Sequence, residues 1–140
     1  MVYRFLLAAV GPHEADDCFQ ETFVAALRAY PGLRDGEALD RWVLRIATRK
    51  AIDAHRARGR RAVPTAKIEE RAGHDDPSPD ASGPVWDAVR ALPTKQRVAV
   101  VHRHVLDRSY AEVAGAMGIS EDAARANVSE GVRKLREALR

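Results

Sequence analysis

The stretch SYAEVAGAMGISEDAARANV (residues 109–128) predicts two helices joined by a tight turn. Before the turn, apolar residues recur at i, i+3, i+4 and i+7, on one face of a helix: Tyr110, Val113, Ala114 and Met117. Gly118 can adopt the left-handed conformation that ends a helix, and Ser120 is a good N-cap for the next one. Ile119, between them, can fill the space inside the turn with an apolar side chain. This outline is typical of a helix-turn-helix, whose second helix enters the DNA major groove. An αα-hairpin with no nucleic-acid role is the alternative.

The residues around this motif complete a C-terminal helical unit. The second helix continues its apolar stripe through Ala124, Val128, Val132 (or Gly131), Leu135 and Leu139. Upstream, one helix is predicted to begin near Val85. A second helix follows Leu92-Pro93 and ends near Asp107, with Thr94 as its expected N-terminal cap. We therefore place one helical domain at residues 85–140.

The N-terminal part of the chain predicts three more helices, over residues 2–10, 14–30 and 39–55, punctuated by Gly11-Pro12 and Pro31-Gly32. Residues 62–84 show no period and contain many Gly, Pro, Ser and acidic residues, which is typical of a flexible linker. The expected fold is all-α, with two small helical domains at 1–61 and 85–140 joined by the linker 62–84. Each domain is near the lower size limit for an independent core, so we expect a partner to stabilise it.

Composition restricts the compartment and the class of protein. The chain is 46% hydrophobic and 31% charged, as expected for a soluble globular protein, and no segment approaches the length of a membrane span. We read residues 5–10 as a core helix and not as a signal peptide, and we expect a cytoplasmic protein. The single cysteine, Cys18, excludes an internal disulfide and falls on the apolar side of its helix, as a buried inert thiol does.

The charge distribution permits a polyanionic partner without requiring one. Residues 1–61 hold 11 basic and 8 acidic side chains, residues 62–84 hold 2 and 5, and residues 85–140 hold 10 and 7. Two mildly basic segments therefore flank an acidic one, which a solvated surface would also explain.

The side chains of an enzyme or metal site do not occur in a recognisable pattern. The sequence has no Gly-rich phosphate loop, no HExxH and no nucleophile elbow. His102 and His104 are two residues apart and point to different faces of a helix, and Asp16-Asp17 has no histidine partner. We expect no enzymatic activity, no cofactor and no metal.

Two sets of motifs in a fixed order resemble a known family. The segments 15–24 (ADDCFQETFV), 42–47 (WVLRIA) and 51–53 (AID) resemble region 2 of group 4 (extracytoplasmic-function, ECF) sigma factors of the sigma-70 family. The segments 92–97 (LPTKQR), 110–121 (YAEVAGAMGISE) and 134–139 (KLREAL) resemble region 4. The resemblance implies an alternative sigma factor that binds core RNA polymerase, through the β′ clamp helices and the β flap, and that recognises promoter DNA. An anti-sigma factor is a further expected partner, and no membrane partner is expected.

The resemblance also implies three sets of site residues. Those expected to face the β′ clamp helices are Asp16, Asp17, Gln20 and Glu21. Those expected near the −10 strand are Trp42, Arg45, Thr48, Arg49, Asp53 and Arg56. Those expected to contact the −35 element are Arg125, Ala126, Asn127, Ser129, Glu130 and Arg133. Glu130 places a carboxylate where phosphate would lie, and Ser129 stands where the family often has an aromatic residue or His, so a degenerate sigma-like interaction module with weakened promoter reading is one alternative. A stand-alone helix-turn-helix regulator, which would bind palindromic sites without polymerase, is the other.

Overall fold

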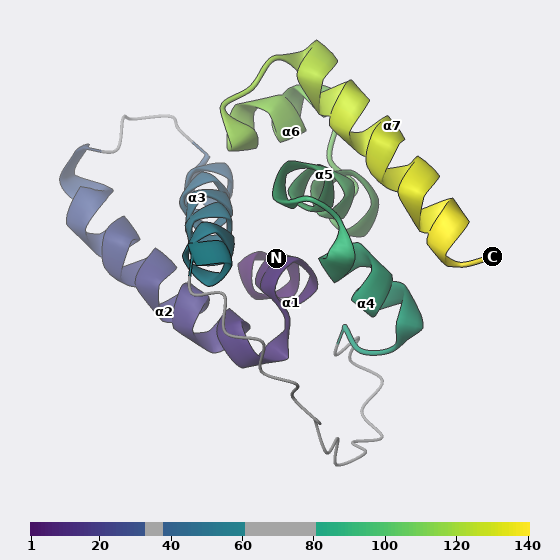
Figure 1. The fold of residues 1–140 in the computed structure, drawn as a ribbon. Helices are drawn as coiled ribbons and strands as arrows, with labels where there is room; N and C mark the ends of the chain where they lie inside the picture. The colour runs from purple at the N-terminus through teal and green to yellow at the C-terminus, as the bar shows by residue number, and fades with distance from the viewer. Residues whose placement is uncertain (33–37, 61–80) are drawn as a thin grey trace.

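The computed structural model describes residues 1–32, 38–60 and 81–140, with residues 55–60 described by their backbone alone, and every regular element in these residues is helical (Figure 1). The elements are α1 (Val2–Val10), α2 (Pro12–Ala29), η1 (Tyr30–Gly32), α3 (Leu39–Arg60), α4 (Pro84–Ala91), α5 (Thr94–Val100), η2 (Val101–Val105), α6 (Tyr110–Met117) and α7 (Glu121–Ala138). The all-α prediction is confirmed. Most of the linker predicted at 62–84 lies outside the described residues.

The N-terminal half is a bundle of α1, α2 and α3. Gly11 has φ 87°, a backbone conformation that L side chains rarely adopt, and Pro12 starts α2 directly after it. This tight turn folds α2 back along α1. Phe5 and Leu6 of α1 are fully buried, and Cys18 is buried as predicted. Helix α3 extends to Arg60, about one turn beyond the predicted end.

The C-terminal half contains the predicted helix-turn-helix. Gly118 adopts the left-handed conformation (φ 67°, ψ 35°), and the hydroxyl of Ser120 accepts a hydrogen bond from the backbone N–H of Ala123 at 3.1 Å. Ser109 caps α6 in the same way, accepting from the N–H of Glu112. The prediction that Thr94 caps α5 is wrong: Pro93 occupies the N-cap, and Thr94 is the first helical residue.

The two halves share one hydrophobic core, a relation that the sequence left open. Phe5 and Leu6 from α1 belong to the same buried cluster as Val89 of α4, Val98 of α5 and Val101 of η2. Figure 1 shows α1 and α3 lying against α4, α5 and α6, with α7 on the outside. A smaller cluster lies beneath the helix-turn-helix and includes the predicted Val113, Ala114, Ala124 and Val128.

A single π-helical turn, η2, continues α5 at the boundary between the halves. Its wider winding is closed by a hydrogen bond from the N–H of Leu106 to the carbonyl of Val101, five residues earlier. The turn leaves Val101 and His102 both fully buried, whereas His104 is exposed. The π-turn therefore aims an imidazole from the C-terminal half at the N-terminal half.

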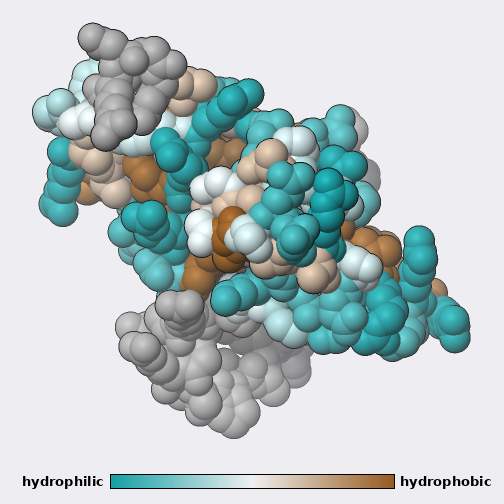
Figure 2. Space-filling model, turned by 90° about the horizontal axis from the view of Figure 1, so that it is seen from above, coloured by the Kyte–Doolittle hydropathy of each residue, from teal (hydrophilic) through white to brown (hydrophobic). Residues whose placement is uncertain are grey.

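The outer surface is mainly polar. On the face in Figure 2, hydrophilic residues predominate and hydrophobic ones appear in small separate patches. Within the described residues, no helix is sufficiently long and apolar to cross a membrane, and no three potential metal ligands gather.

Candidate nucleic-acid and partner interfaces

Helix α7 presents a polar outward face because its apolar residues are inside. Ala124 and Val128 are buried against the rest of the helix-turn-helix, and Gly131 is buried against α5. The opposite positions are exposed, and they include four of the predicted −35 residues: Arg125, Ala126, Ser129 and Arg133. The predicted residue Asn127 is half-buried, and its amide nitrogen donates to the carbonyl of Ala123 at 2.9 Å. Its amide group is thus turned toward its own backbone.

Both arginines on this face pair with carboxylates of the same helix. Arg125 lies 3.2 Å from Glu121, and Arg133 bonds to Glu130 and lies 2.8 Å from Glu137. The hydrogen bond from Arg133 lowers the pKa of the Glu130 carboxyl. Exposed pairs of this kind exchange readily, so each arginine can leave its carboxylate for a phosphate. The face nevertheless carries little net positive charge.

Tyr110, predicted only as an apolar scaffold residue, holds two cations. The guanidinium carbons of Arg103 and Arg125 each lie 4.5 Å from the centre of its ring. The ring therefore fixes Arg125 at the N-terminal end of α7, where recognition helices contact base edges.

Helix α3 divides the predicted −10 residues between two faces. Arg45, Arg49 and Asp53 are exposed, and Trp42 is half-buried. Thr48 is fully buried, with its hydroxyl donating to the carbonyl of Leu44 at 2.7 Å. The side chain of Arg56 lies outside the described residues.

The buried face of α3 meets His102 of the C-terminal half. The Nε2 atom of His102 lies 2.9 Å from the Thr48 hydroxyl oxygen, which accepts its hydrogen when the hydroxyl donates to Leu44. The imidazole also lies against Phe5, with ring centres 4.7 Å apart. Its Nδ1 atom is buried and finds no hydrogen-bond partner among the described residues. Burial, and secondarily the charge of Arg108, lower the pKa of His102 to about 4, so the ring is neutral at pH 7.

A groove of about 490 Å³ runs between α3 and α6 beside this histidine. Arg41 and Arg45 line it from α3, and Arg108 and Glu112 line it from the start of the helix-turn-helix. Arg108 and Glu112 form an ion pair at 2.6 Å. This site was not predicted from the sequence. The spacing of His102 four residues after Val98, in an otherwise apolar stripe, was the available signal.

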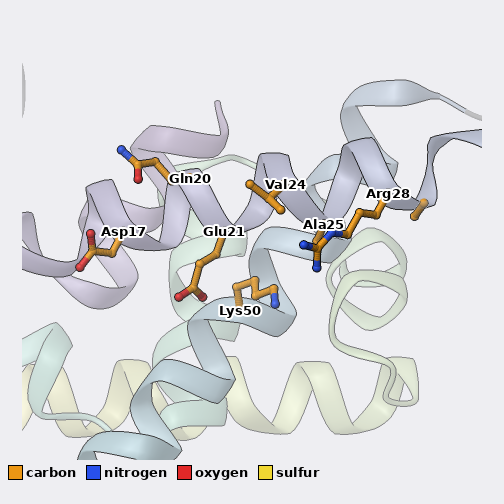
Figure 3. Close-up of a pocket in the computed structure, with 8 residues that line it drawn as sticks. Asp17, Gln20, Glu21, Val24, Ala25, Arg28 and Lys50 are labelled. Carbon is orange, nitrogen blue, oxygen red and sulfur yellow. The ribbon is translucent and has the colours of Figure 1, made fainter.

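The predicted polymerase-binding residues gather on α2. Asp17, Gln20 and Glu21 line a groove of about 660 Å³ between α2 and α3. Figure 3 shows Glu21 of α2 and Lys50 of α3 facing each other across it. Asp16 lies outside this groove and accepts a hydrogen bond from the hydroxyl of Tyr3 at 2.8 Å, which raises the pKa of that tyrosine.

Exposed apolar side chains continue this surface toward the end of α2. Val24, which also lines the groove, is 48% exposed, and Leu27 is 76% exposed. Mixed acidic and apolar side chains on one helix face are suited to a protein partner with basic and apolar groups.

Comparison with known protein families identifies both halves. The family model for sigma-70 region 2 matches residues 1–61, and that for sigma-70 region 4 matches residues 82–135. The ECF RNA polymerase sigma factor SigD of Mycobacterium tuberculosis is 33% identical over 99% of this chain and 72% of its own length. The RNA polymerase sigma factor CarQ of Myxococcus xanthus is 34% identical over 89% of this chain and 74% of its own length.

Solved structures share the fold. The sigma factor RpoE from Bartonella quintana, in complex with the anti-sigma factor NepR, superposes with a TM-score of 0.77 at 23% identity, covering 99% of this chain and 89% of that one. CnrH, in complex with the cytosolic domain of CnrY, gives 0.69 at 22% identity, covering 99% and 79%.

Proposed function

Because the chain belongs to the ECF sigma factors of the sigma-70 family, which direct promoter recognition and transcription initiation, we propose how its surfaces divide that task. Residues 1–61 bind core polymerase and the −10 element, residues 85–140 bind the −35 element, and residues 62–84 join them. The protein acts by binding and not by catalysis, in the cytoplasm where the polymerase is. The observation that carries the proposal is the pair of family matches, in order, on a fold with both candidate surfaces.

The −35 element is read by the outward face of α7. Arg125 contacts a base edge or a phosphate from the first turns of the helix, held by Tyr110. Ala126, Ser129 and Arg133 follow on the same face, and Glu130 sets how close the backbone phosphates come. Asn127 reaches DNA only after its amide leaves the carbonyl of Ala123.

The −10 element is held by α3. Arg45 and Arg49 are exposed cations for the phosphate backbone, and Trp42 supplies an aromatic face on which an unpaired base stacks. Asp53 lies farther along the exposed side of α3. By resemblance Arg56, whose side chain lies outside the described residues, belongs to the same set. Thr48 takes part only when His102 no longer covers it.

Core polymerase binds the α2 surface, through Asp17, Gln20 and Glu21 in the groove and Asp16 beside it. The partners are the β′ clamp helices for this half and the β flap for residues 85–140. RpoE was solved with the anti-sigma factor NepR, and CnrH with the cytosolic domain of CnrY. By that likeness an anti-sigma factor is a further partner of this chain.

A degenerate interaction module, with polymerase binding but little promoter reading, is the second candidate. The carboxylates that pair with Arg125 and Arg133 favour it, because they reduce the positive charge of the reading face.

Run-off transcription with purified core polymerase on a genomic promoter library tests both candidates. The sigma function predicts discrete transcripts that require this chain, and a triple variant Arg45→Ala, Arg49→Ala, Arg125→Ala that still binds polymerase but initiates poorly. Binding to polymerase without initiation on any promoter would favour the degenerate module. Failure to bind core polymerase at near-physiological salt would refute both.

A further inference from the structure

The groove between α3 and α6 has the dimensions of a small-molecule site. Its volume is about 490 Å³, and the two helices that form its walls lie side by side (Figure 1). Sites for small molecules in proteins measure about 300–1,000 Å³. The groove is therefore large enough for a small organic ligand, and its lining indicates which kind.

Positive charge predominates among the side chains that line the groove. Arg41 and Arg45 are exposed and stand one turn apart on α3, so they lie on the same side of that helix. Arg108 lines the groove from the start of the helix-turn-helix, where Glu112 pairs with it at 2.6 Å. Three arginines and one carboxylate give the described lining a net charge of +2. Guanidinium groups bind phosphate through paired hydrogen bonds, so this lining favours a phosphorylated ligand.

The wall formed by α6 is open because its side chains are small. Ala111, Gly115 and Ala116 line the groove from this helix. A Cβ atom added to Gly115 would meet no atom within 4 Å, so the space in front of this residue is empty of side chains. Small-molecule sites combine an apolar wall of this kind with a few polar groups that fix the ligand. A planar ring, such as the base of a nucleotide, can therefore lie directly against α6.

His102 adds an unsatisfied hydrogen-bond acceptor to the residues that line the groove. The Thr48 hydroxyl donates to the carbonyl of Leu44, so its oxygen receives the hydrogen of the His102 Nε2 atom. A neutral imidazole carries one hydrogen, which leaves Nδ1 as an acceptor. This atom is buried without a hydrogen-bond partner among the described residues, a state that folded proteins rarely leave uncompensated. A hydroxyl or amino group of a ligand in the groove would supply the missing donor.

We propose that the groove between α3 and α6 binds a nucleoside phosphate. The phosphates lie against Arg41 and Arg45, the base lies on α6 beside Gly115, and a hydroxyl or amino group of the ligand donates toward His102. Single-stranded DNA held on α3 alone would not use the α6 wall, so the occupant is a free nucleotide. The site does not depend on the proposed function, although Arg45 belongs to both.

Calorimetric titration of the full-length chain with each of ATP, GTP, CTP and UTP tests the proposal. The blocking variant is Gly115→Leu, whose side chain would fill the open space on α6. Its matched control is Ala138→Leu, on an exposed residue at the end of α7 and outside the groove. The charge variant is Arg41→Gln, and its control is Arg136→Gln, an exposed arginine of α7 that does not line the groove.

At least one of these nucleotides should bind saturably, with one site per chain. Arg41→Gln should weaken that binding roughly tenfold, because one charge-assisted contact is lost. Gly115→Leu should abolish it with unchanged helical circular dichroism, and both controls should bind as the unaltered protein does. No saturable binding of any nucleotide at millimolar concentration would overturn the proposal, as would an equal affinity of a helical Gly115→Leu variant and the unaltered protein.

Fragments of the ligand test the two parts of the site. Tripolyphosphate and the nucleoside alone should each bind at least about tenfold more weakly than the nucleotide, which makes both sets of contacts at once. Tripolyphosphate that binds as tightly as the nucleotide would reduce the groove to an anion site and refute the proposal. If Gly115→Leu loses its helices, Arg41→Gln decides, because it alters an exposed side chain: an affinity equal to that of Arg136→Gln refutes the proposal.

Discussion

Acidification should weaken the packing of the two halves because His102 is buried as the neutral imidazole. Its pKa is lowered from 6.5 to about 4 in the folded protein, chiefly by burial and then by Arg108. A histidine released by unfolding or by separation of the halves regains its ordinary pKa and binds a proton. The stability that the buried neutral His102 contributes is therefore present above pH 6.5 and is lost progressively as the pH falls toward 4. At pH 5.5 the free energy of unfolding is lower by about 1.4 kcal/mol, and well below pH 4 this loss reaches its limit of about 3.4 kcal/mol.

The charges around the imidazole act in the same direction. Arg41, Arg45 and Arg108 line the adjacent groove and would repel a protonated ring, and Glu112 is the carboxylate among its lining residues. The hydrogen bond from Arg108 lowers the pKa of Glu112, so this carboxylate remains ionised at pH 5.5. Glu112 is already paired with Arg108 and does not offset the cost of charging His102.

Urea unfolding at pH 7.5 and pH 5.5, followed by circular dichroism, measures the effect. His102→Gln serves as the control because glutamine offers Thr48 a hydrogen-bond donor but does not titrate. The unaltered protein should lose about 1.4 kcal/mol more stability than the control between the two pH values. An equal loss in both proteins would mean that other groups cause the pH dependence and would refute the reasoning.

Three further predictions concern other parts of the chain. Gly131→Ala should destabilise the protein by roughly 1–3 kcal/mol, because the new Cβ would lie 2.6 Å from a methyl carbon of Val100, whereas Gly115→Ala in open space should stabilise it by up to about 1 kcal/mol; urea unfolding distinguishes them. Cys18, whose pKa burial raises to about 11, should resist iodoacetamide at pH 8 until urea is added, as mass spectrometry would detect. Glu130→Arg should steepen the salt dependence of binding to −35 duplex by about one phosphate contact in a fluorescence titration, and an unchanged slope would place this face away from DNA.

Local features were predictable where one residue determines a local conformation. Gly118 and Ser120 define the turn of the helix-turn-helix through backbone geometry and capping, and Gly11-Pro12 defines the first turn in the same way. The apolar stripes located the helices to within a few residues, except that α3 continues past His55. The periodicity of a stripe gives the buried face of a helix but not what covers it.

The packing of the two halves was not predictable for that reason. Thr48 was assigned to DNA by resemblance, and the sequence contains no sign that a histidine 54 residues away covers it. The stacking of Arg125 on Tyr110 was equally hidden, because it depends on the angle between α6 and α7. Its ion pair with Glu121, by contrast, follows from the i, i+4 spacing of the two residues on one helix. The roles of the predicted site residues stay predictions, and the structure adds which of them are exposed.

Selection of promoter sequences from random DNA by the reconstituted complex of this chain with core polymerase tests the central claim most directly. Recognition by α3 and α7 together predicts two enriched blocks at a fixed spacing, with the upstream block weakened by Arg125→Ala and the downstream block by Arg49→Ala. Enrichment of palindromic half-sites about one helical turn apart by the chain without polymerase would contradict the claim and would indicate a stand-alone regulator.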